Sequence, residues 1–373
     1  MYKVAFIGGG INSAIGRTHK ISSQMDGKFE LVAGAFSRNV DINQATSEEF
    51  GIEKNRLYAN YRELLSQEKG NLDAVIVLTP TNTHSEIVID CINTGLPVIC
   101  EKSLATNLQT GVAIRNAVQE QKGFLCVTYN YTGYPQIRVL REKVQKGELG
   151  KITKVVVEMP QEGYIRYTSD GKVPCPQEWR LRDYDIPTIS LDLGTHLHNM
   201  ISFLTGERPK TVIGQENTYG FFSQVIDDVS CIIDYTNDMT TQMWFSKAAL
   251  GHRNGLRVRI YGTEASAEWY QMEPEILRMS NKKGEIILFD RSNDITIGLQ
   301  DRYNRFKVGH PAGFIEAFAN YYSDIAAMLD SYINKEIVES EYILELDKSL
   351  EGLALFEAVH RSSAKRTWEE IEM

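Results

Sequence analysis

The sequence lacks several features that define other classes of protein. No run of apolar residues is long enough to span a bilayer. The formal net charge is -9 and no basic stripe offsets it, which argues against a nucleic-acid-binding protein. The first residues, Met1-Tyr2-Lys3-Val4, enter a strand pattern at once and leave no room for a signal peptide. We therefore expect a cytoplasmic protein without membrane or nucleic-acid partners.

The five cysteines lack the even number of a disulfide framework and the spacing of a metal site. Most of them lie in apolar strand or helix patterns. We predict no metal site and reduced, mostly buried thiols at Cys91, Cys100, Cys126, Cys175 and Cys231.

The composition is that of an ordinary globular protein, with 42% hydrophobic and 24% charged residues. A chain of 373 residues is too long for one ordinary core, so two domains are expected. We predict an α/β protein with a dinucleotide-binding Rossmann domain over 1–128. The remainder, 129–373, is expected to form an α+β domain for substrate binding and oligomerisation, whose C-terminal helix packs back on the first domain.

Short apolar runs alternate with helical segments throughout the first half of the chain. This alternation predicts a doubly wound parallel sheet, which places ligands at the carboxyl ends of its strands. The predicted strands cover residues 4–7, 29–36, 72–79, 97–102 and 124–130.

The first predicted strand ends in Gly8-Gly-Gly10, a glycine turn before a helix. Such a turn lets backbone N–H groups and the helix N-terminus face a pyrophosphate. The third glycine of the usual fingerprint is displaced, because Ser13 fills its position and the next glycine is Gly16. We therefore assign Gly8, Gly10, Ile11, Asn12 and Ser13 to cofactor binding.

The second predicted strand ends in Ser37-Arg38, where an acidic residue would bind the ribose hydroxyl of NAD. An arginine can pair with the additional phosphate of NADP, so NAD or NADP is expected with a preference for NADP. Stacking of Arg38 on adenine and a solvated loop arginine remain alternatives.

Polar residues also follow the third and fourth predicted strands. Asn82 and His84 are candidates to face the cofactor, and a capping role for Asn82 and Thr83 is the alternative. Lys102 follows an apolar strand, and a charge there is a candidate to orient a substrate hydroxyl. The cofactor-binding candidates at the carboxyl ends of the predicted strands are Ser37, Arg38, Thr79, Pro80, Asn82, His84, Glu101 and Lys102.

The second half of the chain has strand patterns separated by few helices, which predicts a mostly antiparallel open sheet. Its aromatic residues Trp244, Tyr261 and Trp269 suggest an oligomer contact on the solvent-facing side. Two polar segments, 161–185 and 281–309, are expected as loops over a site. Helices are expected from Pro135 to Lys146, from His310 to beyond Phe318, and from Leu344 to Val359.

The segment from Ser190 to Asn199 carries the strongest catalytic signal. Asp192 and His196 are four residues apart, which places both side chains on one face of a helix. A carboxylate beside an imidazole suits a general base near neutral pH, and Gly194 between them allows close approach of another molecule. A helix start with a capping aspartate is the alternative. A metal site with His198 is disfavoured, because histidines two residues apart point in different directions on a helix.

Taken in order, the sequence resembles the Gfo/Idh/MocA family of NAD(P)-dependent oxidoreductases over nearly its whole length. The motifs that carry the resemblance are Gly8-Gly-Gly10, Glu101-Lys102, Asp192-x-Gly194-x-His196 and His310-Pro-x-Gly-Phe-x-Glu-Ala-Phe318. Two further stretches resemble a subgroup that acts on sugars, cyclitols or related polyols: Asn130-Tyr-Thr-Gly-Tyr-Pro135 and Gln177-Glu-Trp-Arg180.

The resemblance implies catalysis by Lys102, Asp192 and His196, and usually a homodimer or homotetramer. It also implies a small sugar or polyol as the substrate. Two positions depart from the family pattern: Ser103 replaces the usual proline, and Asn199 stands where many relatives have an aspartate. Candidates for substrate contacts are Asn130, Tyr131, Trp179, Arg180 and His310.

Two other functions remain alternatives to a dehydrogenase. One is a regulatory protein that senses the cofactor without turnover, although such a protein need not retain Lys102, Asp192 and His196. The other is an NAD-dependent enzyme that cleaves glycosides, which a few relatives resemble.

Overall fold

The computed structural model describes residues 1–293 and 299–373, which form two compact units. Unit 1 comprises residues 1–105, 109–133 and 314–346. Unit 2 comprises residues 106–108, 134–313 and 347–373. Segments 129–133 and 314–346, expected in the second domain, are thus grouped with unit 1.

Unit 1 is built on a five-stranded parallel sheet with the strand order β2-β1-β3-β4-β5. The predicted doubly wound sheet is confirmed. Its central strand β3 is buried along its whole length, as its continuous apolar sequence predicts. The strands are β1 (Tyr2–Gly8), β2 (Phe29–Ala35), β3 (Ala74–Leu78), β4 (Val98–Glu101) and β5 (Leu125–Thr128).

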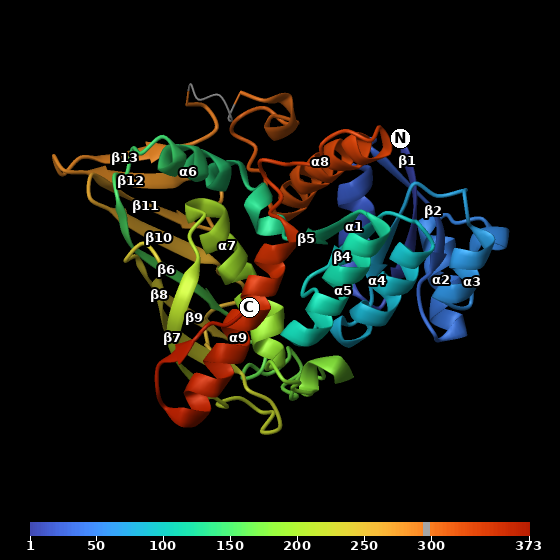
Figure 1. The fold of residues 1–373 in the computed structure, drawn as a ribbon, viewed down its shortest axis with the longest axis horizontal. Coiled ribbons are helices and arrows are strands. Elements are labelled where there is room, and N and C mark those ends of the chain that lie inside the picture. Colours follow the sequence, from blue (N-terminus) through green and yellow to red (C-terminus); the bar gives the residue numbers. More distant parts are fainter. Residues whose placement is uncertain (294–298) are drawn as a thin grey trace. The chain divides into compact units, whose positions relative to one another are not determined.

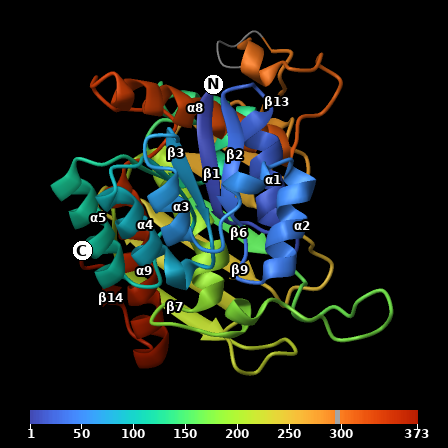
Figure 2. The ribbon, with the colours of Figure 1, turned by 90° about the vertical axis from the view of Figure 1, so that its right-hand side faces the viewer.

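Helices cover both faces of this sheet. The chain crosses from β1 to β2 in one direction and from β3 to β5 in the other, so right-handed crossovers place α1 opposite α4 and α5 (Figure 2). The helices of this unit are α1 (Ala14–Gln24), α2 (Val40–Phe50), α3 (Tyr61–Gln67), α4 (His84–Asn93), α5 (Leu108–Gln121) and α8 (Phe314–Ile333).

Helix α8 returns from the far end of the sequence and packs beside α1. The ring of Tyr322 lies 5.7 Å from that of His19 and 5.4 Å from that of Phe29. Tyr321 donates a hydrogen bond of 2.9 Å to the carbonyl of Val127 in β5. Helix α8 is therefore part of unit 1, and the last helix, α9 (Leu346–Lys365), belongs to unit 2.

Unit 2 is built on a nine-stranded sheet with the order β13-β12-β11-β10-β6-β9-β8-β7-β14. Strands β6 and β9 pair in parallel and the other neighbours in this order are antiparallel, which confirms the predicted, mostly antiparallel sheet. The strands are β6 (Ile152–Pro160), β7 (Pro209–Asn217), β8 (Asp228–Tyr235), β9 (Thr240–Ser246), β10 (Arg257–Gly262), β11 (Ala265–Tyr270), β12 (Leu277–Asn281), β13 (Ile286–Phe289) and β14 (Glu369–Glu370).

The expectation of a loop over 281–309 is partly wrong. Strand β13 and a 3-10 turn, Asp301–Tyr303, form within it. Residues 294–298 of that segment lie outside the described residues. Buried Arg291 donates to the carbonyls of Tyr303 and His310. A single arginine therefore fixes two points of the chain that follows β13.

Three helices cover one face of the nine-stranded sheet (Figure 1): α6 (Pro135–Gln145), α7 (Thr195–Thr205) and α9. Trp269 points to this face, where its ring lies 5.0 Å from that of Tyr134, and it is fully buried. Its suggested place on a solvent-facing oligomer surface is therefore wrong. Tyr261 is 40% exposed, and Trp244 alternates along β9 with buried Met243 and Phe245, so both lie on the uncovered face.

The cysteines agree with the sequence-based expectation. All five thiols are free, and only Cys175 is exposed. Among the described helices, none combines the length and the apolar character needed to span a membrane.

Candidate functional site

The glycine turn after β1 is closed so tightly that side chains would not fit. Gly8 and Gly9 have φ values of 86° and 74°, a region that favours glycine. A Cβ on Gly8 would lie 2.8 Å from the backbone of Leu78, and one on Gly16 would lie 1.8 Å from the carbonyl oxygen of Gly9. The displaced third glycine, Gly16, thus permits close packing of α1 against the turn. This geometry fits the cradle that a dinucleotide pyrophosphate requires.

The residues between the turn and α1 hold the turn in shape. The N–H of Ile11 donates to Thr46 Oγ1 at 3.0 Å, and that of Ser13 donates to the Gly10 carbonyl at 2.7 Å. Ile11 and Asn12 are exposed. Helix α1 then begins at Ala14, and its N-terminus would attract an anion through its first N–H groups and its dipole.

The end of β2 is fixed by an asparagine. Asn43 Oδ1 accepts hydrogen bonds from the N–H groups of Phe36 (2.8 Å) and Ser37 (3.2 Å), and Ser37 Oγ accepts one from the Asn39 N–H. Arg38 is exposed and forms no ion pair with any residue that the structure describes. Its guanidinium is therefore accessible to a ligand at the end of this strand.

His84, predicted to face the cofactor, is fully buried instead. Its Nδ1 lies 2.8 Å from the Ser103 carbonyl and its Nε2 lies 2.8 Å from the Thr79 carbonyl. Both ring nitrogens face the protein backbone, so we assign His84 to holding together the chain after β3 and the chain after β4. Burial lowers the pKa of this imidazole.

The structure does not show the helix cap that was the alternative for Asn82 and Thr83. Asn82 is exposed, and the Thr83 hydroxyl oxygen lies 2.8 Å from both Pro80 O and Thr79 Oγ1 and does not cap α4. Asn82 remains a candidate for cofactor contact.

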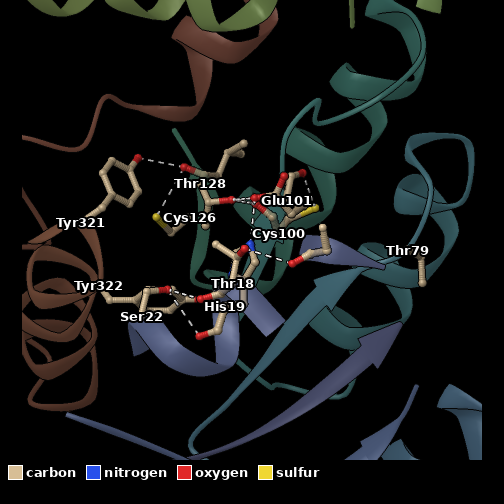
Figure 3. Close-up of polar contacts among 12 residues, drawn as sticks. Thr18, His19, Ser22, Thr79, Cys100, Glu101, Cys126, Thr128, Tyr321 and Tyr322 are labelled. Atoms are coloured by element: carbon tan, nitrogen blue, oxygen red, sulfur yellow. Dashed lines mark hydrogen bonds and ion pairs between the residues drawn. The ribbon is translucent and has the colours of Figure 1, made fainter. Parts of the chain in front are cut away.

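Glu101, at the end of β4, is the centre of a buried polar network (Figure 3). Its Oε1 lies 3.0 Å from His19 Nε2 and accepts a hydrogen bond from the Thr128 hydroxyl. On its other side, His19 Nδ1 lies 2.5 Å from the hydroxyl of Tyr322. Because the carboxylate only accepts, Nε2–H of His19 donates to Glu101.

This network determines the charge of Glu101. Burial alone raises the pKa of the carboxyl, but the hydrogen bond and charge of His19, together with Lys102 and Thr128, lower it further than burial raises it. The pKa of Glu101 therefore lies below its ordinary value, and the group is ionised at neutral pH. Lys102 itself is half-buried, and the peptide bond that joins it to Ser103 is cis.

The turn after β5, Asn130–Gly133, is buried at each of its four residues. Asn130 is 3% exposed, and its Nδ2 has no hydrogen-bond partner among the described residues. A buried amide donor without a partner is costly, so this atom is well suited to donate to a ligand. Tyr131 is also buried, with its ring 6.2 Å from that of Phe314.

In unit 2 the segment with the strongest catalytic signal begins as a π-helical turn, Ser190–Gly194, and continues as α7. Single π-turns are frequent at functional sites because they change the direction of side chains within a helix. Asp192 and His196 are 9% and 7% exposed. The predicted helix start is thus correct in place, although its first turn is wider than an α-helix.

Asp192 is bound by two cations within unit 2. Its Oδ2 lies 2.5 Å from Lys247 Nζ and also accepts from Arg180 Nη1. Arg180 comes from a 3-10 turn, Glu178–Leu181, and lies over the ring of Trp179 at 4.3 Å. Of these residues, Lys247 was missed by the sequence analysis.

A signal for Lys247 is present in the sequence. It directly follows β9, and along that strand every second residue, Met243 and Phe245, is buried. The same alternation continued to position 247 places the lysine on the buried face. A charged residue on the buried side of a strand requires a partner, and Asp192 provides it.

The surroundings of Gly194, His198 and Asn199 correct or refine the predictions for this segment. A Cβ on Gly194 would lie 2.6 Å from the ring of Phe356 and 2.9 Å from that of Phe245, so glycine is required by the protein's own core rather than by another molecule. His198 Nε2 lies 3.1 Å from Glu351 Oε1 of α9, and Asn199 is buried.

The last two substrate candidates lie on loops. Trp179 is half-buried, and its Nε1 donates to Gln177 Oε1 at 3.0 Å. His310 is exposed, and its Nδ1 lies 3.1 Å from the Lys307 carbonyl.

Comparison with known proteins gives matches over both halves of the chain. Residues 2–129 match a family described as oxidoreductases with an NAD-binding Rossmann fold, and residues 137–268 match the GFO/IDH/MocA C-terminal domain. The uncharacterized oxidoreductase YfiI of Bacillus subtilis is 28% identical over 96% of this chain and 94% of its own length. The myo-inositol 2-dehydrogenase of Thermotoga maritima is 26% identical, over 66% of this chain and 67% of the relative.

Solved structures agree with these matches. An inositol dehydrogenase homolog from Azotobacter vinelandii, crystallised with NADH and myo-inositol, is 25% identical and superposes with a TM-score of 0.90. The superposition covers 99% of this chain and 97% of that structure.

Proposed function

This chain belongs to the Gfo/Idh/MocA family of NAD-binding oxidoreductases, and we propose that it oxidises a secondary alcohol, or reduces a ketone, of a sugar, cyclitol or related polyol. The observation that carries the proposal is the burial of Asp192 in the π-turn and of His196 in the first turn of α7, both in unit 2. The similarity to inositol dehydrogenases supports the substrate class.

A dinucleotide fits unit 1 on the geometry of its glycine turn, with Gly8, Gly9 and the N-terminus of α1 at the pyrophosphate. When bound, nicotinamide supplies the carbon that gives or accepts the hydride. Asn130 Nδ2 is the donor that best suits a substrate hydroxyl among the candidates of this unit, because it is buried without a partner in the described chain. Tyr131, Trp179, Arg180 and His310 are the further candidates for substrate contacts.

The proposed proton transfer uses three residues. In the oxidation direction His196 takes the proton of the substrate hydroxyl, and Asp192 orients the imidazole or relays the proton. Lys102 donates a hydrogen bond to the reacting oxygen. General acid–base catalysis of this kind contributes a factor on the order of 10²–10⁴.

The test is a survey of cyclitols, sugars and sugar alcohols with NAD⁺ and NADP⁺, followed by absorbance of the reduced cofactor. Turnover by the unaltered protein is expected. His196→Ala and Lys102→Met should lower kcat by on the order of 10²–10⁴ while cofactor fluorescence titrations stay unchanged. The exposed His252, altered to Ala, serves as the matched control and should retain activity.

Three outcomes would contradict parts of this proposal. Full activity of both catalytic variants would remove the assigned roles. Cofactor binding without turnover of any substrate would favour the sensor, and release of an aglycone without net cofactor reduction would favour the glycoside-cleaving enzyme.

For the cofactor, we infer a preference for NADP over NAD from Ser37 and the accessible guanidinium of Arg38. We also propose a cytoplasmic homodimer or homotetramer that associates through the uncovered sheet face with Trp244 and Tyr261. Free thiols support the location. A monomeric mass in light scattering at micromolar protein would contradict the assembly.

A further inference from the structure

We propose that Lys247 is a positioning residue, which fixes the carboxylate of Asp192 in the orientation that His196 requires. This inference rests on the proposed function and deepens it, because it adds to the reaction a residue that no sequence motif singled out.

Lys247 is held from several sides. Its side chain is 6% exposed, and its Nζ lies 2.5 Å from Asp192 Oδ2 and 4.9 Å from the ring centre of Tyr164. Its backbone N–H donates to the Asp227 carbonyl, and its own carbonyl accepts from the Tyr164 N–H, each at 2.8 Å. A lysine fixed at both its backbone and its ammonium group holds its partner with little freedom.

Two further acids of unit 2 have backbone donors of their own. Asp227 accepts from the N–H groups of Tyr219 and Gly220, and Asp183 accepts from those of Thr188 and Ile226. Both acids are therefore satisfied by backbone donors. Asp192 is the carboxylate to which Lys247 donates.

The second cation on Asp192 differs from Lys247 in its exposure. The side chain of Arg180 is 31% exposed and belongs to a surface turn, whereas Lys247 follows a strand. Solvent weakens the ion pair of the exposed partner more than that of the buried one. Lys247 is thus the partner that holds Asp192 whether or not the loop with Arg180 moves.

The contacts from Lys247 and Arg180 both fall on Oδ2 of Asp192, and this indicates what the lysine does. Two cations favour the ionised carboxylate, which accepts hydrogen bonds but does not donate them. With Oδ2 occupied, the rotation of the carboxylate is fixed, and its other oxygen has a defined direction for accepting an N–H. An imidazole whose N–H is bound in this way keeps one tautomer, with the opposite nitrogen as the base.

The experiment compares Lys247→Met, Lys247→Arg, Asp192→Asn and the double variant Lys247→Met/Asp192→Asn in the full-length protein. Lys247→Met should lower kcat on the order of 10²-fold with an unchanged KM for the cofactor, because a displaced catalytic group loses its alignment. Lys247→Arg retains the charge and should recover much of the lost kcat. In the Asp192→Asn background Lys247→Met should add little, because the two residues act as one unit.

Lys143 provides the control. It is the other buried lysine among the described residues, with Nζ 2.8 Å from Glu148, and it lies outside the proposed site in the same unit. Lys143→Met reports what loss of a buried lysine and its ion pair does to folding alone, measured as the unfolding midpoint. A kcat of Lys247→Met equal to that of the unaltered, active protein would overturn the inference alone, as would fully additive effects of Lys247→Met and Asp192→Asn. Absence of turnover by the unaltered protein would overturn the proposed function, and this inference with it.

Discussion

Two buried carboxylates, Glu101 in unit 1 and Asp192 in unit 2, are exposed to nearly the same extent, at 7% and 9%. Their partners differ in kind. Glu101 is bound by the ring of His19, which lies on helix α1, and by the hydroxyl of Thr128, which lies on strand β5. Asp192 is bound by two full cations, one of which comes from a partly exposed turn.

The difference shows two ways of keeping a carboxylate charged inside a protein. Hydrogen-bond donors on regular elements give a rigid arrangement, which suits the end of a strand that must hold its shape beside Lys102. In unit 2 a buried lysine at a strand end holds the carboxylate, and a partly exposed arginine on a turn adds a second ion pair. Unit 1 thus fixes its carboxylate through hydrogen bonds from regular elements, whereas unit 2 fixes its carboxylate through a buried ion pair to which a turn adds a second one.

The largest expected effect on folding is in unit 1. His19→Ala removes the ring between Glu101 and Tyr322, and it should lower the free energy of unfolding by roughly 3 kcal/mol or more, because a buried charge loses its partner. Urea unfolding measures the change. Ser22→Ala, a buried position on the same helix whose hydroxyl donates to the carbonyl of Thr18, should cost much less. Equal losses would mean that α1 packing, not the network, provides the stability.

The same network predicts a pH dependence with a definite sign. The pKa of Glu101 is lower in the folded protein than its ordinary value of 4.5, so the group contributes its full stability above that pH. The contribution is lost as the pH falls below 4.5 through the lowered pKa. Unfolding midpoints between pH 7 and pH 3 should therefore fall more steeply for the unaltered protein than for His19→Ala, which lacks the main group that lowers the pKa. Parallel curves would contradict the assigned charge state.

In unit 2 the corresponding test concerns packing beneath the π-turn. Gly194→Ala would place a methyl group 2.6 Å from the ring of Phe356, and it should cost about 1–3 kcal/mol of folding free energy through overpacking. Gly163→Ala is the matched control, because a Cβ there meets no atom within 4 Å. If both variants unfold at the same temperature, the π-turn shifts to accommodate the methyl group, and the predicted overpacking is wrong.

The smallest expected effect is on the cofactor. Arg38→Ala should weaken NADPH binding about tenfold, which corresponds to about 1.4 kcal/mol, and leave NADH binding nearly unchanged. Fluorescence titration with both cofactors measures the ratio. Equal weakening for NADH and NADPH would instead support stacking on adenine, the alternative for this side chain.

Several features of the fold followed directly from residue patterns. The run Leu72–Thr79 predicts a buried strand, and β3 forms within it. The alternation along Leu256–Tyr261 predicts a half-exposed strand, and β10 buries Val258 and Ile260 while Arg257 and Arg259 stay half-exposed. Such patterns are reliable because burial on one or both faces is decided by neighbours one or two residues away.

Other features depend on residues far apart in the chain. Sequence spacing suggested a cofactor-facing His84, but the ring is enclosed by the carbonyls of Thr79 and Ser103. Trp269 was expected at the surface, but Tyr134 covers it. Nothing local distinguishes an exposed aromatic residue of an open sheet from one beneath a helix, because the covering helix precedes β11 by more than a hundred residues.

Residue order by itself determined the alternation of strands and helices, the glycine turn and the identity of the acid and the imidazole around Gly194. Only the tertiary structure decided which partners these groups receive: Lys247 and Arg180 for Asp192, His19 and Thr128 for Glu101, and Phe356 against Gly194. The physical reason is the distance along the chain over which each effect acts. Backbone preferences and side-chain periodicity act over a few residues, whereas the charge and the packing of a buried group depend on whichever distant segments the completed core brings within a few ångströms of it.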